Sequence, residues 1–147
     1  MIQHSIDRLQ HLCATIPDLL RKIPDADFSK KPAPEKWSKQ EILGHLIDSA
    51  TNNHQRFIRI QFEHEPLIMY AQNEWNESSH YNNMKKEHVI HFWQTYNLHL
   101  AEVIKRIDPE KLHRKGIAND KINTLAWFIT DYVEHMEYHL RQIVVYK

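Results

Sequence analysis

Two histidines four residues apart are the residues of this sequence best placed to bind a metal ion. His135 and His139 lie in the segment from Asp131 to Gln142, whose apolar residues recur at helical spacing. Residues i and i+4 share one face of an α-helix, with Cβ atoms roughly 5–6 Å apart, so both imidazoles can bind one ion from the same side. Two ligands rarely suffice. His45, in the separate segment Ile-Leu-Gly-His-Leu-Ile-Asp-Ser, is the candidate third ligand.

Three neutral imidazoles around a divalent ion leave an open coordination position, which is typical of catalytic rather than structural sites. Such an ion lowers the pKa of bound water or stabilises a bound thiolate, giving a nucleophile near neutral pH. Asp131, one turn before His135, and Asp48, three residues after His45, are placed to orient a ligand ring. Either carboxylate could equally be a surface charge. Glu137 does not occupy the glutamate position of a His-Glu-x-x-His motif, so we do not expect it to act as a base.

Other interpretations of the histidines remain open. A single histidine on an apolar face is more often a buried polar residue with satisfied hydrogen bonds than a ligand. His54, nine residues after His45 and on roughly the same side of its helix, is the alternative third ligand. His88 and His91 are expected to face solvent. The competing hypothesis for the whole chain is a non-catalytic helical bundle that binds a small molecule or a protein partner, with structural or vestigial histidines.

Composition narrows the class of protein. The 147 residues predict a single domain, residues 1–147. The sequence holds 19 Lys plus Arg against 19 Asp plus Glu, which argues against nucleic-acid binding. Cys13 is the single cysteine, so no intrachain disulfide is possible, and its place on an apolar stripe predicts a buried, inert thiol. No run approaches the roughly 20 apolar residues of a membrane span. We therefore expect a cytoplasmic protein without a membrane segment.

The pattern of apolar residues predicts four amphipathic helices. The first covers about residues 2–23, with a kink at Pro17. The second runs from 38 to about 63 and begins at a capping box formed by Ser38 and Glu41. The third covers about 84–107. The fourth follows a polar loop that contains Gly116, and Asn123 or Thr124 can cap it.

These helices predict an all-α fold, a four-helix bundle with a long connection between helices two and three. The connections allow either up-and-down or crossover topology. The long one, residues 66–83, lacks a clean period and carries Tyr70, Asn73 and Trp75. Long connections in compact domains are often functional. We expect it to fold over one end of the bundle, with these three side chains at the entrance to the substrate site.

Three stretches resemble the DinB/YfiT-like superfamily, and together they span essentially the whole chain. Residues 37–49 with Arg56-Phe57 resemble the second helix of that family, and residues 70–75 are similar to its middle Tyr-Asp-Gln-x-x-Trp segment. Residues 131–143 resemble its C-terminal helix. Ala71 stands where relatives often have aspartate.

The resemblance implies a four-helix bundle, commonly dimeric, that binds Ni²⁺ or Zn²⁺ through His45, His135 and His139. Relatives include thiol S-transferases that use bacillithiol or mycothiol, and a mycothiol-dependent isomerase. The expected function is therefore a metal-dependent enzyme with thiol S-transferase or hydrolase-like chemistry at the open metal position. It would act on a small-molecule substrate, in some relatives with a low-molecular-weight thiol.

Overall fold

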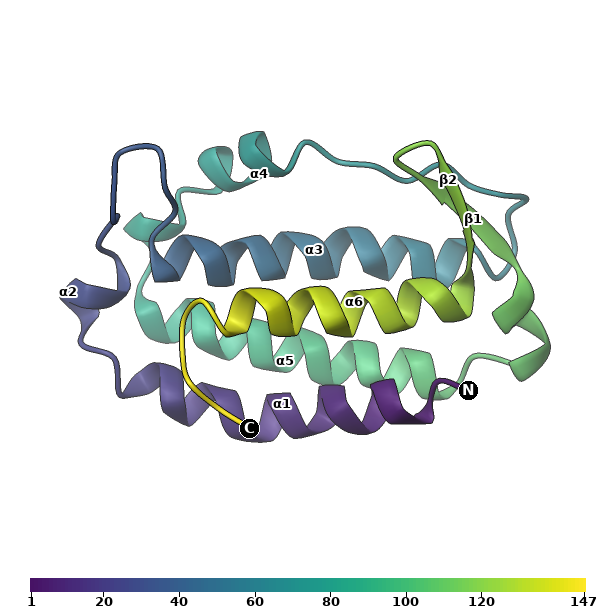
Figure 1. Cartoon of the computed structure of the whole chain (residues 1–147), viewed down its shortest axis with the longest axis horizontal. Coiled ribbons are helices and arrows are strands. Elements are labelled where there is room, and N and C mark those ends of the chain that lie inside the picture. The colour runs from purple at the N-terminus through teal and green to yellow at the C-terminus, as the bar shows by residue number, and fades with distance from the viewer.

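A computed structural model describes all 147 residues, and four long helices lie side by side in it (Figure 1). The long helices are α1 (Gln3–Arg21), α3 (Lys39–Arg59), α5 (Lys86–Lys105) and α6 (Leu125–Leu140). The connections hold two short helices, α2 (Asp25–Phe28) and α4 (Gln72–Ser79), and two 3₁₀ turns, η1 (Tyr81–Asn83) and η2 (Pro109–His113). Strands β1 (Lys115–Ala118) and β2 (Lys121–Thr124) form a small antiparallel sheet. The predicted all-α four-helix bundle is confirmed, with the two strands as a minor addition.

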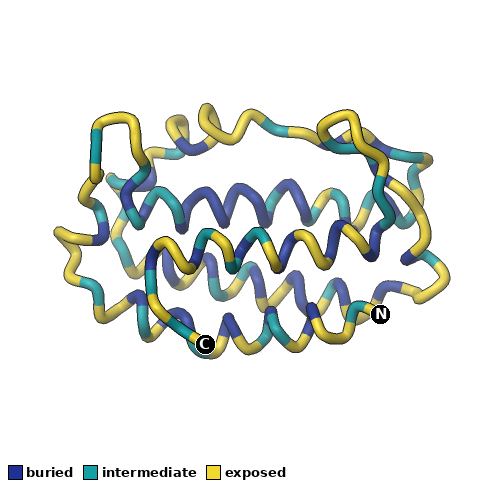
Figure 2. Tube along the Cα trace, in the orientation of Figure 1, coloured by how far each residue is buried: buried dark blue, intermediate teal, exposed yellow.

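One core of 31 buried residues joins the four long helices. The buried positions face the inside of the bundle, and α3 is buried along most of its length (Figure 2). Cys13 lies in this core with no exposed surface, and burial raises the pKa of its thiol to about 12. The prediction that Cys13 is buried is therefore confirmed, and its raised pKa agrees with the expectation of an inert thiol.

The helix ends follow from local sequence signals. Ser38 caps α3 in a complete capping box: its hydroxyl accepts from the Glu41 amide at 3.0 Å, and the Glu41 carboxylate accepts from the Ser38 amide at 2.9 Å. Thr124, rather than Asn123, caps α6, because its hydroxyl accepts from the backbone amide of Trp127 at 3.1 Å. Helix α1 continues past Pro17 without being split in two.

The connection between α3 and α5 decides the topology of the bundle. Helices α3 and α5 run in the same direction, so the intervening chain must return along the length of the bundle (Figure 1). Our expectation that it covers one end was wrong, because the segment lies along α3. It is attached to that helix near both ends: Arg56 donates to the Ile68 carbonyl at 2.8 Å, and Gln40 donates to the Tyr81 carbonyl at 2.6 Å.

Gly44 allows the returning segment to lie close to α3. A Cβ atom at this position would stand 2.1 Å from Cδ2 of the Tyr81 ring, far inside van der Waals contact. Glycine ordinarily weakens a helix interior relative to alanine. Here its missing side chain makes room for an aromatic ring.

The predicted polar loop around Gly116 is instead the β1–β2 hairpin. Asn119 and Asp120 form its turn with φ of 51° and 63°, a left-handed conformation that Asn and Asp tolerate better than most residues. The hairpin also binds the returning segment, since the Ile68 amide donates to the Ile117 carbonyl at 3.1 Å. No helix of the chain has both the length and the hydropathy that a membrane span requires.

Candidate metal centre

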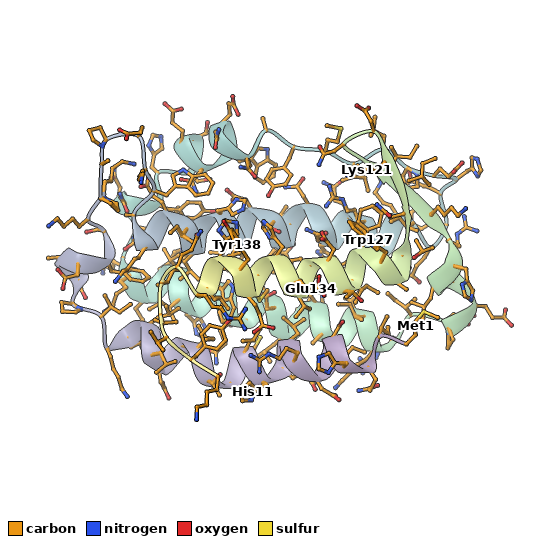
Figure 3. The ribbon with its side chains drawn as sticks, viewed as in Figure 1. Met1, His11, Lys121, Trp127, Glu134 and Tyr138 are labelled. Carbon is orange, nitrogen blue, oxygen red and sulfur yellow. The ribbon has the colours of Figure 1, made fainter.

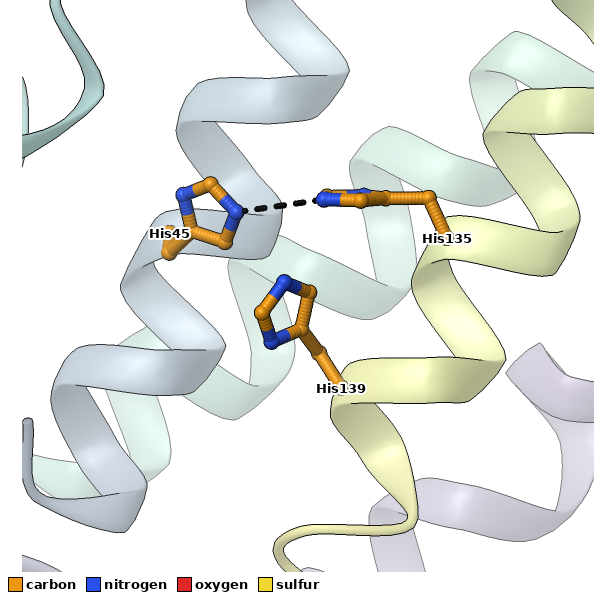
Figure 4. A group of neighbouring side chains, drawn as sticks. All are labelled: His45, His135 and His139. Carbon is orange, nitrogen blue, oxygen red and sulfur yellow. Dashed lines mark hydrogen bonds between the residues drawn. The ribbon is translucent and has the colours of Figure 1, made fainter.

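The bundle brings His45 of α3 together with His135 and His139 of α6. One ring nitrogen from each lies within 4.8 Å of the other two. Nε2 of His45 is 3.4 Å from Nε2 of His135, and the ring of His139 lies beside this pair with its Nε2 directed toward them (Figure 4). His45 is 1% exposed, and the two residues of α6 are half-buried. His45 lies in the N-terminal half of α3, opposite the C-terminal half of α6.

The spacing of one pair of these nitrogens fits a divalent ion. Ligands about 2.0–2.1 Å from a tetrahedral zinc ion stand roughly 3.4 Å from one another, and the His45–His135 separation is 3.4 Å. Nδ1 of His45 points away from the other two rings and is buried without a hydrogen-bond partner (Figure 4). The Nε2 atoms therefore face one another across a common point, while the outward nitrogen of His45 has no partner.

Burial keeps two of the rings in the neutral form that binds metals. It lowers the pKa of His45 to about 3, with further lowering by the positive charge that His135 and His139 can carry. The pKa of His135 falls to about 4 through burial, followed by the effects of His139 and Arg56. These two imidazoles are thus unprotonated at neutral pH, with lone pairs available to an ion.

Two residues that the sequence analysis did not single out for the site contact the candidate ligand rings. Nδ1 of His139 lies 3.0 Å from Oε1 of Gln142. Since the amide oxygen is an acceptor, this contact places the His139 proton on Nδ1 and leaves Nε2 free for a metal. Trp37 packs against His45 with ring centroids 4.9 Å apart. The spacing of Gln142, three residues after a candidate ligand on a helix, was the one available signal.

The two predicted orienting carboxylates lie in different surroundings. Asp48 is 3% exposed, and its Oδ1 accepts a 2.5 Å hydrogen bond from the Tyr81 hydroxyl, while Oδ2 is buried without a partner. Burial raises the pKa of Asp48 to about 6, against a smaller lowering by Tyr81. Asp131 is exposed and makes no side-chain hydrogen bond. Neither carboxylate is hydrogen-bonded to a histidine.

The remaining candidates lie away from His45, His135 and His139. Glu137 binds Arg8 of α1, with its Oε1 2.7 Å from Nη2, and so faces the opposite side of α6. Nδ1 of His54 lies 3.0 Å from the Tyr96 hydroxyl on α5, which directs this ring away from His45. His88 is exposed, as expected.

The residues expected at the substrate entrance divide into two groups. Asn73 lines a hollow of about 470 Å³ whose wall also includes His139. Tyr70 and Trp75 instead pack edge to face, with centroids 5.7 Å apart, on the segment that lies along α3. Burial raises the pKa of Tyr70 to about 12, and the charge of Asp48 adds to this effect.

Comparison with known proteins settles the family. A sequence model of the DinB superfamily matches residues 7–143, which is nearly the whole chain. The chain belongs to the DinB superfamily. No curated protein matches it significantly.

Two solved structures share the fold of this DinB-superfamily chain. One is YfiT from Bacillus subtilis, described as a probable metal-dependent hydrolase with an unusual four-helix bundle topology. It superposes with a TM-score of 0.85 at 20% identity, over 95% of this chain and 82% of YfiT. The other is a histidine-to-alanine mutant of the mycothiol-dependent maleylpyruvate isomerase. Its TM-score is 0.80 at 10% identity, over 99% of this chain but 62% of the isomerase. At these identities the likeness establishes the fold.

Proposed function

We propose that this chain is a metal-dependent enzyme in which His45, His135 and His139 bind one divalent ion, nickel or zinc. One observation carries the proposal: nitrogens of three imidazoles from two helices converge within 4.8 Å in a partly buried place. One buried and two half-buried polar rings without a common partner would be costly. A three-histidine site accepts either metal, and availability often decides between them.

The proposed reaction is hydrolysis or thiol S-transfer on a small-molecule substrate. When bound, the ion would supply an open position at which water, or a low-molecular-weight thiol, loses its proton near neutral pH. The similarity to a probable metal-dependent hydrolase supports the first reaction, and the similarity to a mycothiol-dependent isomerase supports the second.

The chain's own residues would position the ligands and the substrate. Gln142 fixes the ring of His139. Asp48 would orient His45, because Asp48 Oδ2 and His45 Nδ1 are both buried without partners one turn apart on α3, and one bridging water would satisfy both. Asp131 is the proposed partner of His135, from one turn earlier on α6.

Substrate contacts are proposed for the three residues expected at the entrance. Asn73 shares a hollow with His139 and would donate to or accept from a bound substrate. Tyr70 and Trp75 would close the side of the site that faces the returning segment, where their rings pack together.

Metal analysis of the purified protein tests the proposal. We expect about one divalent ion per chain in the parent and in His88→Ala, a control at an exposed position of α5. The variants His45→Ala, His135→Ala and His139→Ala should each lose most of it. Assays of nitrophenyl ester hydrolysis and of thiol transfer to a bimane electrophile then separate the two reactions. Full metal content in all three variants would place the ion elsewhere and end the proposal. No metal in the parent after supply of Ni²⁺ and Zn²⁺ would point to the non-catalytic bundle.

The proposal includes a homodimer. The exposed Phe92 on α5 supports it: this side chain is 44% exposed, stacks with the exposed His88 ring at 6.4 Å and contacts the half-buried Tyr96 edge to face at 5.5 Å. Exposed apolar clusters are common at contacts between protein chains. Sedimentation velocity across a range of concentrations measures the assembly, and a single species with the mass of one chain at every concentration would exclude the dimer.

A further inference from the structure

A groove leads away from the candidate metal centre toward α2. It consists of two adjoining hollows of about 470 Å³ and 410 Å³, here called the near hollow and the far hollow. The near hollow is lined by His139, and the far hollow reaches Asp27 near the end of α2. They adjoin because both are lined by the same four residues, Pro32, Trp37, Ile42 and Gln142. A molecule with its reactive group at His139 therefore has space to extend along this groove.

The walls of the groove touch two of the three histidines. Trp37, which lines both hollows, packs against His45 at 4.9 Å between ring centroids. Gln142, which also lines both hollows, is hydrogen-bonded through its Oε1 to Nδ1 of His139. A ligand in the groove would thus contact the residues that hold the candidate ligand rings. The groove therefore belongs to the same site as the three histidines.

The far hollow contains positively charged side chains that no ion pair neutralises. Its walls include Lys30 and Lys39 against the single carboxylate of Asp27, and none of the three takes part in an ion pair. The neighbouring Lys31, in contrast, is paired with Glu41 at 2.9 Å. Two unpaired ammonium groups in one hollow favour an anionic group over a neutral one.

The near hollow differs from the far hollow in chemistry. The charges of Lys36 and Glu35 balance, and three neutral amides complete the polar wall: Gln72, Asn73 and Gln142. Amides can donate and accept hydrogen bonds but do not select for charge. The groove therefore has a polar half beside His139 in which the charges balance, and a cationic half farther out.

We propose that this groove binds a carboxylate-bearing substrate in an extended conformation. The reactive group lies at the three histidines, the polar middle contacts the amides, and the carboxylate reaches Lys30 and Lys39. The inference rests on the proposed metal site and names the substrate class of that site.

Hydroxamate probes test the groove separately from the metal site. The protein is loaded with Co²⁺, whose visible absorption reports hydroxamate binding. Three probes are titrated at low salt: acetohydroxamate without a tail, adipic acid monohydroxamate with a carboxylate tail, and its methyl ester. We expect the acid to bind about twofold to thirtyfold more tightly than the ester, because an exposed lysine–carboxylate pair contributes about 0.2–1 kcal/mol and two pairs are available.

Variants test whether Lys30 and Lys39 produce the preference for the acid over the ester. The double substitution Lys30→Gln and Lys39→Gln should make the acid and the ester bind equally, with acetohydroxamate unchanged. Lys121→Gln is the control, since Lys121 lies in the hairpin at the far end of the bundle from α2 and should keep the preference (Figure 3). Equal affinity for acid and ester in the parent, or a preference that survives the double substitution, would overturn the groove proposal alone. If acetohydroxamate leaves the Co²⁺ spectrum unchanged, the proposed metal site fails as well.

Discussion

At the scale of single residues, burial shifts the pKa values of the candidate site's groups in opposite directions, down for the histidines and up for the aspartate. Burial lowers the pKa of His45 to about 3 and that of His135 to about 4. It raises the pKa of Asp48 to about 6. In the unfolded chain, histidine titrates near 6.5 and aspartate near 3.9. The metal-free protein should therefore bind protons differently from its unfolded state in mildly acidic solution.

Acid should destabilise the metal-free protein. Between about pH 6 and pH 4, the unfolded chain binds two protons at His45 and His135, while the folded chain binds one at Asp48. The histidine contribution is fully present above pH 6.5 and is lost as the pH falls toward the folded pKa values, and Asp48 offsets half of that loss. These groups should lower the free energy of unfolding by about 1.4 kcal/mol per pH unit of acidification, which urea titrations of chelator-treated protein measure.

The Asp48→Asn variant separates the opposing contributions. It keeps a carbonyl acceptor for the Tyr81 hydroxyl but removes the titration, so the slope should steepen to about 2.7 kcal/mol per pH unit. His88→Gln, at an exposed position, should leave the slope unchanged. Stability that stays flat or rises toward pH 4 in the chelated parent would contradict the assigned pKa directions.

Gln142 should contribute to metal affinity without touching the ion. Its amide oxygen lies 3.0 Å from Nδ1 of His139, and loss of such a supporting contact typically weakens metal binding about tenfold to a hundredfold. Gln142→Ala should show this loss in a competition titration with a metal indicator. Gln142→Glu keeps an acceptor oxygen and should bind nearly as tightly as the parent. Gln3→Ala, on the exposed face of α1, is the matched control. An unchanged affinity in Gln142→Ala would remove Gln142 from the site.

At the scale of elements, the segment between α3 and α5 depends on Gly44. In an ordinary helix interior, Gly44→Ala would stabilise by about 1 kcal/mol. Here the new Cβ would meet the Tyr81 ring at 2.1 Å, and overpacking typically costs about 1–3 kcal/mol. We expect the substitution to lower the free energy of unfolding in the parent and to be neutral or stabilising in a Tyr81→Ala background. A double-mutant cycle measures the difference, and additive effects would show that the ring does not depend on Gly44.

The sequence predicted those elements whose positions follow from patterns of residues near one another in the chain. Apolar stripes and the Ser38–Glu41 capping box place the four long helices to within a few residues at most ends. The hairpin was missed because each strand has only four residues, too short for an alternating pattern to stand out. Its position also depends on distant contacts, since a Cβ on Gly116 would lie 2.6 Å from the Ile60 side chain. The course of residues 66–83 along α3 likewise depends on long-range hydrogen bonds.

The same distinction between local sequence signals and long-range contacts applies to the candidate site. His135 and His139 could be predicted as a pair because their spacing is helical, and His45 because it borders an apolar stripe. The support from Trp37 and Gln142 could not be predicted, because it depends on how the loop before α3 and the end of α6 fold around the rings. Nor could periodicity show that Tyr81 binds Asp48.

At the scale of the whole molecule, metal binding should be coupled to folding. The site joins α3 to α6, so an ion bound only by the folded state stabilises the entire bundle by mass action. With free metal a hundredfold above its Kd, the gain is about 2.7 kcal/mol, which corresponds to roughly 5–10 °C in Tm for a chain of this size. Differential scanning fluorimetry with and without chelator measures the shift. A variant with all three histidines changed to alanine should show none, and an equal shift in that variant would place the ion elsewhere.

The central claim is that these three histidines bind one ion, and a structure of the metal-loaded protein tests it most directly. Crystals grown with Zn²⁺ or Ni²⁺, examined by anomalous scattering at the metal edge, should show a single site. We predict Nε2 of His45, His135 and His139 at about 2.0–2.1 Å from that ion, with at least one position open to water or substrate. An ion bound elsewhere, or one bound by the α6 pair with His45 turned away, would contradict the account.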